Sequence, residues 1–172
     1  MKITGFRQLH GDFGWRTQSF LKIETSDGTV GWTEYYEGAG NLGLNALLAA
    51  HLERLVGEDP LQVESILVRL QGKTIQAPSG LNHQAIGTIG NALLDIKGKA
   101  LGVPVYELLG GSHRDSIRCY ANGWFTGART PEDFAAKART AVAVGFHGLK
   151  WDPFGASYMT LDRAGRFRCI EI

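Results

Sequence analysis

The pattern of apolar residues changes at Gly110-Gly111, and this change constrains the fold more than any other feature of the 172-residue sequence. Before the glycine pair, alternating apolar residues are followed by apolar residues at helical spacing. After the pair, the order is a short alternating run, a helical pattern and a second short apolar run. The sequence therefore predicts two domains, residues 1–111 and 112–172, with different architectures.

The first domain begins with three predicted antiparallel strands. The first strand covers residues 3–9, and the other two lie within residues 19–37 and meet at Asp27-Gly28. Asp-Gly between alternating runs is typical of a hairpin turn, because Gly adopts the positive φ that the turn needs. Helical spacing follows in residues 44–56, 61–70 and 86–100, and a short helical turn in residues 105–110. We expect an α+β domain in which a small three-stranded meander is backed by helices.

The second domain is predicted to be a βαβ unit. Residues 117–121 alternate in polarity, which places Cys119 in the core of a strand, and residues 146–151 form a second short strand. Between them, Thr130-Pro131 and the two acids that follow are typical of a helix start. Strand, helix and strand at this spacing favour parallel pairing.

One βαβ unit is too small to bury a parallel sheet on both faces. A closed (β/α)8 barrel needs about 250 residues, so residues 112–172 predict the start of an incomplete TIM-like barrel. Residues 162–172, with Phe167 and Ile170 on one face, indicate the beginning of a further helix. We expect the chain to be a fragment of a longer protein; the alternative is that a partner holds its last third.

Composition and charge exclude several classes of function. With 44% hydrophobic and 20% charged residues, the chain is of the globular type, and its formal charge of +1 shows no basic excess for nucleic-acid binding. No apolar run is long enough to span a membrane, and the N-terminus lacks the apolar core of a signal peptide. Cys119 and Cys169 form neither a disulfide framework nor a zinc motif. We expect a cytoplasmic protein without nucleic-acid or membrane partners.

Two segments carry a resemblance to a known family. NALLDIKGKALGVPVYELLGG (91–111) followed by IRCYANG (117–123) resembles the junction between the capping domain and the barrel of the mandelate racemase/muconate lactonizing enzymes, in the enolase superfamily. GFHGLKWDPFG (145–155) resembles the second barrel strand of that family, which carries a lysine motif, and is most similar to the branch of galactonate dehydratase-like acid-sugar dehydratases. The predicted order of elements agrees with this family along the whole chain.

The resemblance implies a chemistry and a cofactor. Members bind Mg2+ through carboxylates at the ends of the third, fourth and fifth barrel strands, a base removes the proton α to a substrate carboxylate, and the metal stabilises the enediolate. This sequence does not reach those strands, so we predict no metal ligand and no Mg2+ binding by this chain alone. The complete protein is expected to be a homo-oligomeric acid-sugar dehydratase. A racemase or cycloisomerase acting on a hydroxy acid, or a non-catalytic remnant serving as a folding or dimerisation module, remain alternatives.

Lys150 and Asp152 are the candidate catalytic residues. They lie at the C-terminal end of a predicted barrel strand, where the active sites of such barrels collect, and the strand period puts them on one face about 7 Å apart. The family pattern is Lys-x-Lys, whereas Asp152 here favours the ammonium form of Lys150. We therefore expect Lys150 to stabilise a substrate carboxylate as a fixed cation rather than to act as the base. The alternatives are a solvated lysine at a strand end and a single Mg2+ ligand at Asp152.

The candidate substrate-binding residues come from two other places. The loop 10–18 and the segment 37–45 resemble the two capping-domain loops that close over the substrate, and His10, Trp15 and Arg16 offer a hydrogen bond, an apolar wall and a cation. Asn122 and Trp124, after the first barrel strand, are expected to line the pocket. The alternative for the loop is an ordinary solvated turn. His51 and His83 are expected near helix surfaces or helix starts and are given no role.

Overall fold

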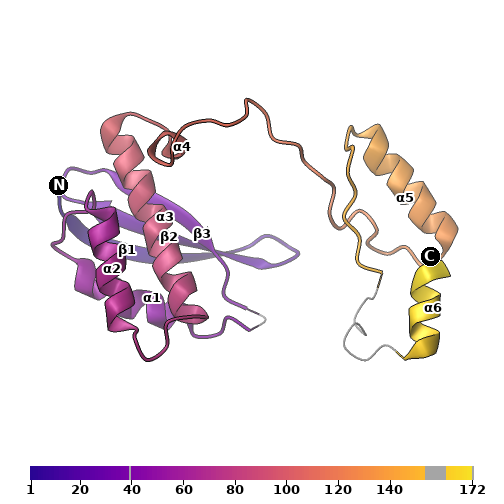
Figure 1. The fold of residues 1–172 in the computed structure, drawn as a ribbon, viewed down its shortest axis with the longest axis horizontal. Helices are drawn as coiled ribbons and strands as arrows, with labels where there is room; N and C mark the ends of the chain where they lie inside the picture. The colour runs from indigo at the N-terminus through magenta and orange to yellow at the C-terminus, as the bar shows by residue number, and fades with distance from the viewer. Residues whose placement is uncertain (39, 154–161, 172) are drawn as a thin grey trace. The chain divides into compact units, whose positions relative to one another are not determined.

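The computed structural model describes residues 1–38, 40–153 and 162–171 (Figure 1), so Phe154 and Gly155 of the lysine motif and the side chain of Ile170 lie outside the described part. The chain forms two compact units, Met1–His113 and Arg114–Ile172. We call them the N-terminal unit and the C-terminal unit. No helix among the described residues has the length and apolar character needed to cross a membrane.

The N-terminal unit contains the predicted meander. Strands β1 (Ile3–Asp12), β2 (Thr17–Thr25) and β3 (Val30–Tyr35) form an antiparallel sheet in the order β1-β2-β3. Gly28, at φ 85°, lies in the turn between β2 and β3 as predicted. The loop between β1 and β2 is shorter than expected, because the pairing of the two strands continues to Asp12 and Thr17. His10 consequently lies within β1 and not in a loop.

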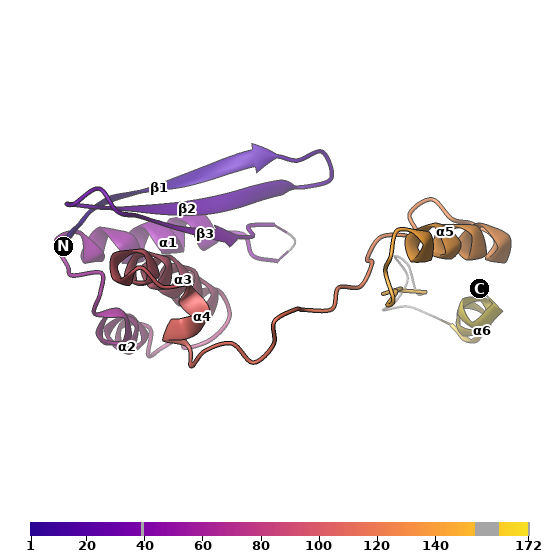
Figure 2. The same ribbon diagram turned by 90° about the horizontal axis from the view of Figure 1, so that it is seen from above.

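Helices cover one face of this sheet. Helices α1 (Leu44–Leu52), α2 (Val63–Lys73) and α3 (Leu81–Leu101) lie on the same side of it (Figure 2), with the short η1 (Glu53–Leu55) and α4 (Val105–Leu108) at their ends. The predicted apolar stripe of α3 is confirmed except at Ala100, which is exposed. The chain turns back after α3 and packs against Gly98 instead, where a Cβ atom would lie 2.8 Å from the carbonyl oxygen of Val103. Core residues at most 1% exposed are Ile3, Leu21, Ile23, Leu44, Leu48, Leu52, Ile66, Ala85, Ile89, Ala92, Leu93 and Ile96.

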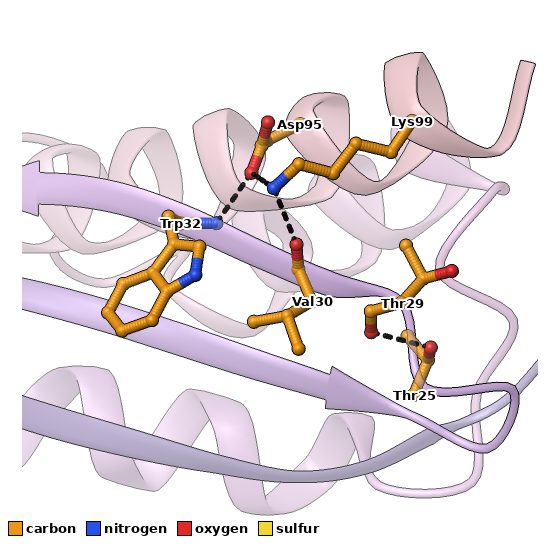
Figure 3. A network of polar contacts seen from close by, with 6 residues as sticks. All are labelled: Thr25, Thr29, Val30, Trp32, Asp95 and Lys99. Carbon is orange, nitrogen blue, oxygen red and sulfur yellow. Dashed lines mark hydrogen bonds and ion pairs between the residues drawn. The ribbon is translucent and has the colours of Figure 1, made fainter. Parts of the chain in front are cut away.

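Helix α3 also satisfies the free edge of β3 (Figure 3). The backbone N–H of Trp32 donates to Asp95 Oδ2 at 2.8 Å, and Lys99 Nζ donates to the carbonyl of Val30 at 2.7 Å and to Asp95 at 2.6 Å. Unpaired backbone groups at a sheet edge invite pairing with another chain. Asp95 and Lys99 therefore both anchor α3 on the sheet and occupy backbone groups that another strand would need.

His51 differs from its expected place on a helix surface. Its side chain lies in the core with 3% exposure, and neither ring nitrogen has a hydrogen-bond partner among the described residues. The cause is its position in α1, where it follows Leu44 and Leu48 on the apolar face. Burial lowers the pKa of His51 from its ordinary value of 6.5, an effect that the neighbouring Asn82 side chain only partly offsets. His83, in contrast, is exposed near the start of α3, as expected.

We expect the N-terminal unit to lose stability as the pH falls through about 6.5. Burial lowers the pKa of His51 in the folded chain, so the unfolded chain takes up a proton there more readily than the folded chain does. His51→Leu should remove this dependence and raise the free energy of unfolding near pH 5 by about 1 kcal/mol. Urea unfolding at a series of pH values measures it. His83→Leu is the control and should retain the wild-type slope. Equal slopes in wild type and His51→Leu would contradict the prediction.

The C-terminal unit contains helices α5 (Pro131–Ala143) and α6 (Arg163–Glu171). The predicted start of α5 is confirmed: the side chain of Thr130 accepts from the backbone N–H of Asp133, and the Asp133 carboxylate accepts from the N–H of Thr130. The Asp133 carboxylate also accepts from the backbone N–H of Arg129. The N–H of Arg129, followed by that of Thr130, lowers the pKa of Asp133. Local capping signals therefore fix the position of this helix.

The two predicted parallel strands are reduced to a single parallel bridge between Ala121 and Leu149. The N–H of Ala121 donates to Gly148 at 2.9 Å, and its carbonyl accepts from the N–H of Lys150 at 2.8 Å. Among the described residues no third strand pairs with either segment, and two strands alone are marginally stable. The prediction that Cys119 lies in a strand core is wrong, since its side chain is exposed.

Candidate functional site

In the C-terminal unit, the candidate site is the segment end that carries Lys150. The backbone N–H of Lys150 donates to the carbonyl of Ala121, and the carbonyl of Lys150 accepts from the indole N–H of Trp124 at 2.8 Å. The ring of the next residue, Trp151, lies 5.3 Å from Phe134 of α5. Side chains alternate along an extended segment, so Lys150 and Asp152 lie on the side opposite to the one that packs against α5. The side chain of Lys150 is exposed to solvent there.

Asn122 and Trp124 sit in the turn that follows Ala121. Gly123, at φ 71°, reverses the chain, and the hydroxyl and N–H of Thr126 both bond the carbonyl of Gly123. Asn122 is exposed, and its side-chain oxygen accepts from the N–H of Gly123 at 3.0 Å. Trp124 is partly buried against Phe125, Phe134 and Trp151. Both residues therefore lie next to the strand end, and the indole of Trp124 is engaged with the backbone of Lys150.

In the N-terminal unit, Trp15 and Arg16 come together at the tip of the β1–β2 hairpin. The guanidinium of Arg16 lies 4.3 Å from the centre of the Trp15 ring and 5.4 Å from that of Tyr36, and it is paired with Glu34 at 3.0 Å. Its Nε atom is buried and has no partner among the described residues. Trp15 remains 72% exposed. The cation predicted for substrate binding is thus held in place by an acid and by two aromatic rings.

His10 is not part of this cluster. It pairs with Ser19, and its Nδ1 lies 2.9 Å from the Ser19 hydroxyl, while its ring meets that of Tyr35 edge to face at 6.3 Å. Ser19 and Tyr35 are buried on the side of the sheet that faces the helices, whereas Glu34, the partner of Arg16, is exposed. His10 and Arg16 are therefore directed to different faces of the sheet.

Several polar residues around these loops were not among the sequence candidates. The Tyr35 hydroxyl donates to Asn45 at 2.5 Å, and burial raises the pKa of Tyr35. Glu37 accepts from the backbone N–H groups of Gly43 and Asn45 at 2.9 and 3.3 Å, at the start of α1. A carboxylate is stabilised at this position by the helix dipole. An acidic residue a few positions before a helical pattern was the available sequence signal.

The described residues do not fit a magnesium site. No group of three or more His, Cys, Asp and Glu side chains lies close enough together in this part of the chain to hold a metal ion. Mg2+ is bound in proteins mainly through carboxylate oxygens together with water, and Asp152 alone does not provide such a site.

Comparison with known proteins identifies the family. The N-terminal domain of the mandelate racemase / muconate lactonizing enzymes matches residues 13–110. The chain belongs to this family. Its relatives include D-gluconate dehydratase of Thermoproteus tenax, 36% identical over 152 residues, and D-galactonate dehydratase of Pectobacterium atrosepticum, 40% identical over 132 residues. These alignments cover 87% and 76% of this chain but only 31% and 34% of the relatives, so the chain spans about a third of their length.

Solved structures agree with the fold. A protein of Mesorhizobium loti, provisionally assigned as a dehydratase, superposes with a TM-score of 0.91 at 32% identity, covering 99% of this chain and 48% of that one. A protein of Burkholderia xenovorans, provisionally assigned as an L-alanine-DL-glutamate epimerase and bound to magnesium and fumarate, superposes with a TM-score of 0.84 at 30% identity, covering 99% and 50%. The capping-domain fold predicted from the sequence is thereby confirmed, and at least one neighbour in the family holds magnesium.

Proposed function

We propose that this sequence is the N-terminal part of a Mg2+-dependent acid-sugar dehydratase of the galactonate type. Residues 1–111 would be its capping domain and residues 112–172 the start of its barrel. The observation that carries the proposal is the identity of 36% and 40% to proteins named as D-gluconate and D-galactonate dehydratases. A dehydratase of this kind removes the proton α to the substrate carboxylate and expels the β-hydroxyl as water, which leaves an enol that becomes a 2-keto acid.

We assign Lys150 the role of a fixed cation that stabilises the substrate carboxylate as negative charge develops on it. Its exposed ammonium group and its place opposite the aromatic contacts with α5 support this role. Asp152 would lie on the same face of the segment as Lys150, and Asn122 and Trp124 would complete the strand end. On the capping domain, Trp15 and Arg16 would supply an apolar wall and a cation for a polyhydroxy acid. His10 would offer a hydrogen bond through its ring from the other face of the sheet, separately from Arg16.

The chain by itself is proposed to be inactive, because the resemblance places the metal-binding carboxylates on barrel strands beyond this sequence. We further propose that the complete protein works as a homo-oligomer, as the resemblance implies. The alternatives within the superfamily are a racemase or a cycloisomerase. The first of these is supported by the Burkholderia xenovorans neighbour, which is provisionally assigned as an epimerase, because racemases and epimerases both invert a stereocentre. A capping domain retained as a folding or dimerisation module is the non-catalytic alternative.

The test uses a complete enzyme that contains this sequence, assayed with Mg2+ and with D-galactonate, D-gluconate and other aldonates. We expect formation of a 2-keto-3-deoxy acid, detected as its semicarbazone, from at least one of these acids. A change in optical rotation without a keto acid would instead support a racemase. No reaction with any acid, in a folded protein that holds Mg2+, would support the non-catalytic alternative.

A further inference from the structure

The backbone N–H and the backbone carbonyl of Lys150 are both hydrogen-bonded to one short segment, residues 121–124. Its N–H donates to the carbonyl of Ala121 at 2.8 Å, and its carbonyl accepts from the indole N–H of Trp124, also at 2.8 Å. The first bond belongs to the parallel bridge, but the second comes from a side chain in the following turn. An indole N–H is a donor only, and its direction is fixed by the orientation of a rigid ring.

The ring of Trp124 is itself fixed on two sides. It meets Phe134 at 6.3 Å and Trp151 at 6.5 Å, both edge to face, which is a favoured geometry for aromatic pairs. Its backbone is fixed by the turn at Gly123, to which Thr126 donates two hydrogen bonds. Phe134 in turn lies one residue after the capping box at Thr130 and Asp133. The direction of the indole N–H is therefore set in part by the turn at Gly123 and by Phe134 of α5, which are distant from Lys150 in the sequence.

The cluster also determines where Lys150 does not point. Trp151 is packed against Phe134 at 5.3 Å, and adjacent side chains of an extended segment project to opposite faces. Rotation of the 150–151 peptide would break the bond to Trp124 and pull Trp151 out of the cluster. The same contacts thus hold the carbonyl of Lys150 towards Trp124 and its side chain on the face away from α5.

We propose that Trp124 is a positioning residue: its indole N–H, bonded to the Lys150 carbonyl, sets the direction in which the Lys150 ammonium group meets the substrate. This inference rests on the proposed role of Lys150 and goes beyond it, because Trp124 acts through the backbone of the lysine. A shift of a reacting group by about 1 Å can lower a rate by about 100-fold. Loss of one hydrogen bond, with the aromatic ring retained, is expected to have a smaller effect.

Trp124→Phe tests the proposal, with Trp151→Phe as the matched control. Both changes remove one indole N–H from the same cluster, but the N–H of Trp151 has no hydrogen-bond partner among the described residues. In the 172-residue chain, NMR should show about tenfold slower hydrogen exchange at the indole N–H of Trp124 than at that of Trp151. The carbonyl 13C resonance of Lys150 should move in Trp124→Phe and stay in place in Trp151→Phe.

In the complete enzyme, Trp124→Phe should lower kcat by about tenfold with KM changed less than about twofold. Trp151→Phe should lower kcat several-fold less, since it keeps an aromatic ring in the cluster and removes no hydrogen bond to Lys150. Equal exchange of the two indoles, or an unmoved Lys150 carbonyl resonance in Trp124→Phe, would overturn the proposal. A wild-type kcat in Trp124→Phe, in an enzyme that Lys150→Met inactivates, would also overturn it, because the lysine would then work without the hydrogen bond from Trp124. Full activity of Lys150→Met would instead contradict the proposed function of the lysine, whatever the NMR result for Trp124.

Discussion

Gly31→Ala is expected to destabilise the N-terminal unit by about 3 kcal/mol, and so to lower its Tm by more than about 10 °C. Gly31 lies in β3 where α3 packs most closely on the sheet. A Cβ atom at this position would overlap the carbonyl oxygen of Ala92 and would lie 2.7 Å from Cγ1 of Ile96. The oxygen belongs to the helix backbone, so no side-chain rotation can relieve the overlap. The helix must move away from the strand.

That movement would also affect the contacts at the edge of β3. Asp95 and Lys99 reach the backbone of Trp32 and Val30 at 2.8 and 2.7 Å only while α3 stays against the strand. Displacing the helix would therefore lengthen these hydrogen bonds and leave donors and acceptors of the edge unpaired. The expected loss of stability thus combines overpacking with the weakening of this polar network.

The matched control is Gly87→Ala, which makes the same chemical change on α3 itself. Apart from its chain neighbours and the nearby backbone of α3, a Cβ atom at Gly87 would have no atom within 4 Å, and alanine is favoured over glycine inside a helix by about 1 kcal/mol. We expect this variant to be more stable than wild type. Thermal and urea unfolding followed by far-ultraviolet circular dichroism measure both variants. A Gly31→Ala protein as stable as Gly87→Ala would refute the close packing of α3 on β3.

The parts of the fold that the sequence predicted depend on contacts over a few residues. The turn at Asp27-Gly28 and the capping box at Thr130 and Asp133 involve groups no more than four positions apart. The buried stripe of α3 repeats at helical spacing along one helix. Such patterns are visible in a single sequence because the same segment supplies both partners.

Contacts between distant segments were not predicted, for the converse reason. Trp32 and Asp95 are 63 positions apart, Val30 and Lys99 are 69 apart, and the indole of Trp124 meets a carbonyl 26 positions away. Nothing in the local sequence of a tryptophan specifies which carbonyl its single N–H will bond. These partners follow from the packing of whole elements, as in the sheet edge of Figure 3.

His51 is a different case, because a local signal was present. Residues 44, 48, 51, 52 and 55 follow helical spacing, and all of them are buried. That spacing places a histidine on the apolar face, although histidine is buried less often than the leucines around it. For His10, the error had another origin: a polar segment was interpreted as a loop, whereas strand pairing with Ser19 continues through it.

Lys150→Met is expected to lower kcat/KM of the complete enzyme by about 100- to 1,000-fold, the range typical of removing one group that stabilises developing negative charge. Methionine keeps most of the length of the side chain and removes the ammonium group. The backbone of Lys150, bonded to Ala121 and Trp124, is unaffected by this change, so the fold of the segment should be retained. The loss would then report on charge and not on structure.

Lys137→Met provides the matched control. Lys137 lies on α5 in the same unit, so the substitution removes the same charge and adds the same side chain at a position outside the candidate site. We expect wild-type kcat/KM for this variant. Steady-state rates with the best aldonate substrate, and the yield of 2-keto acid, measure both proteins, and circular dichroism confirms that both are folded.

The kcat and KM of Lys150→Met also distinguish the two roles that the sequence left open for this lysine, a fixed cation and a solvated residue at a strand end. If the lysine is a fixed cation that stabilises developing charge, the variant should bind substrate with a KM within about tenfold of wild type while kcat falls much further. If the lysine is only a solvated residue at a strand end, Lys150→Met and Lys137→Met should be equally active. Both variants lose one positive charge from the same unit. A general electrostatic effect on the approach of the substrate would therefore lower kcat/KM of Lys150→Met and of Lys137→Met alike, and would not produce a difference between them.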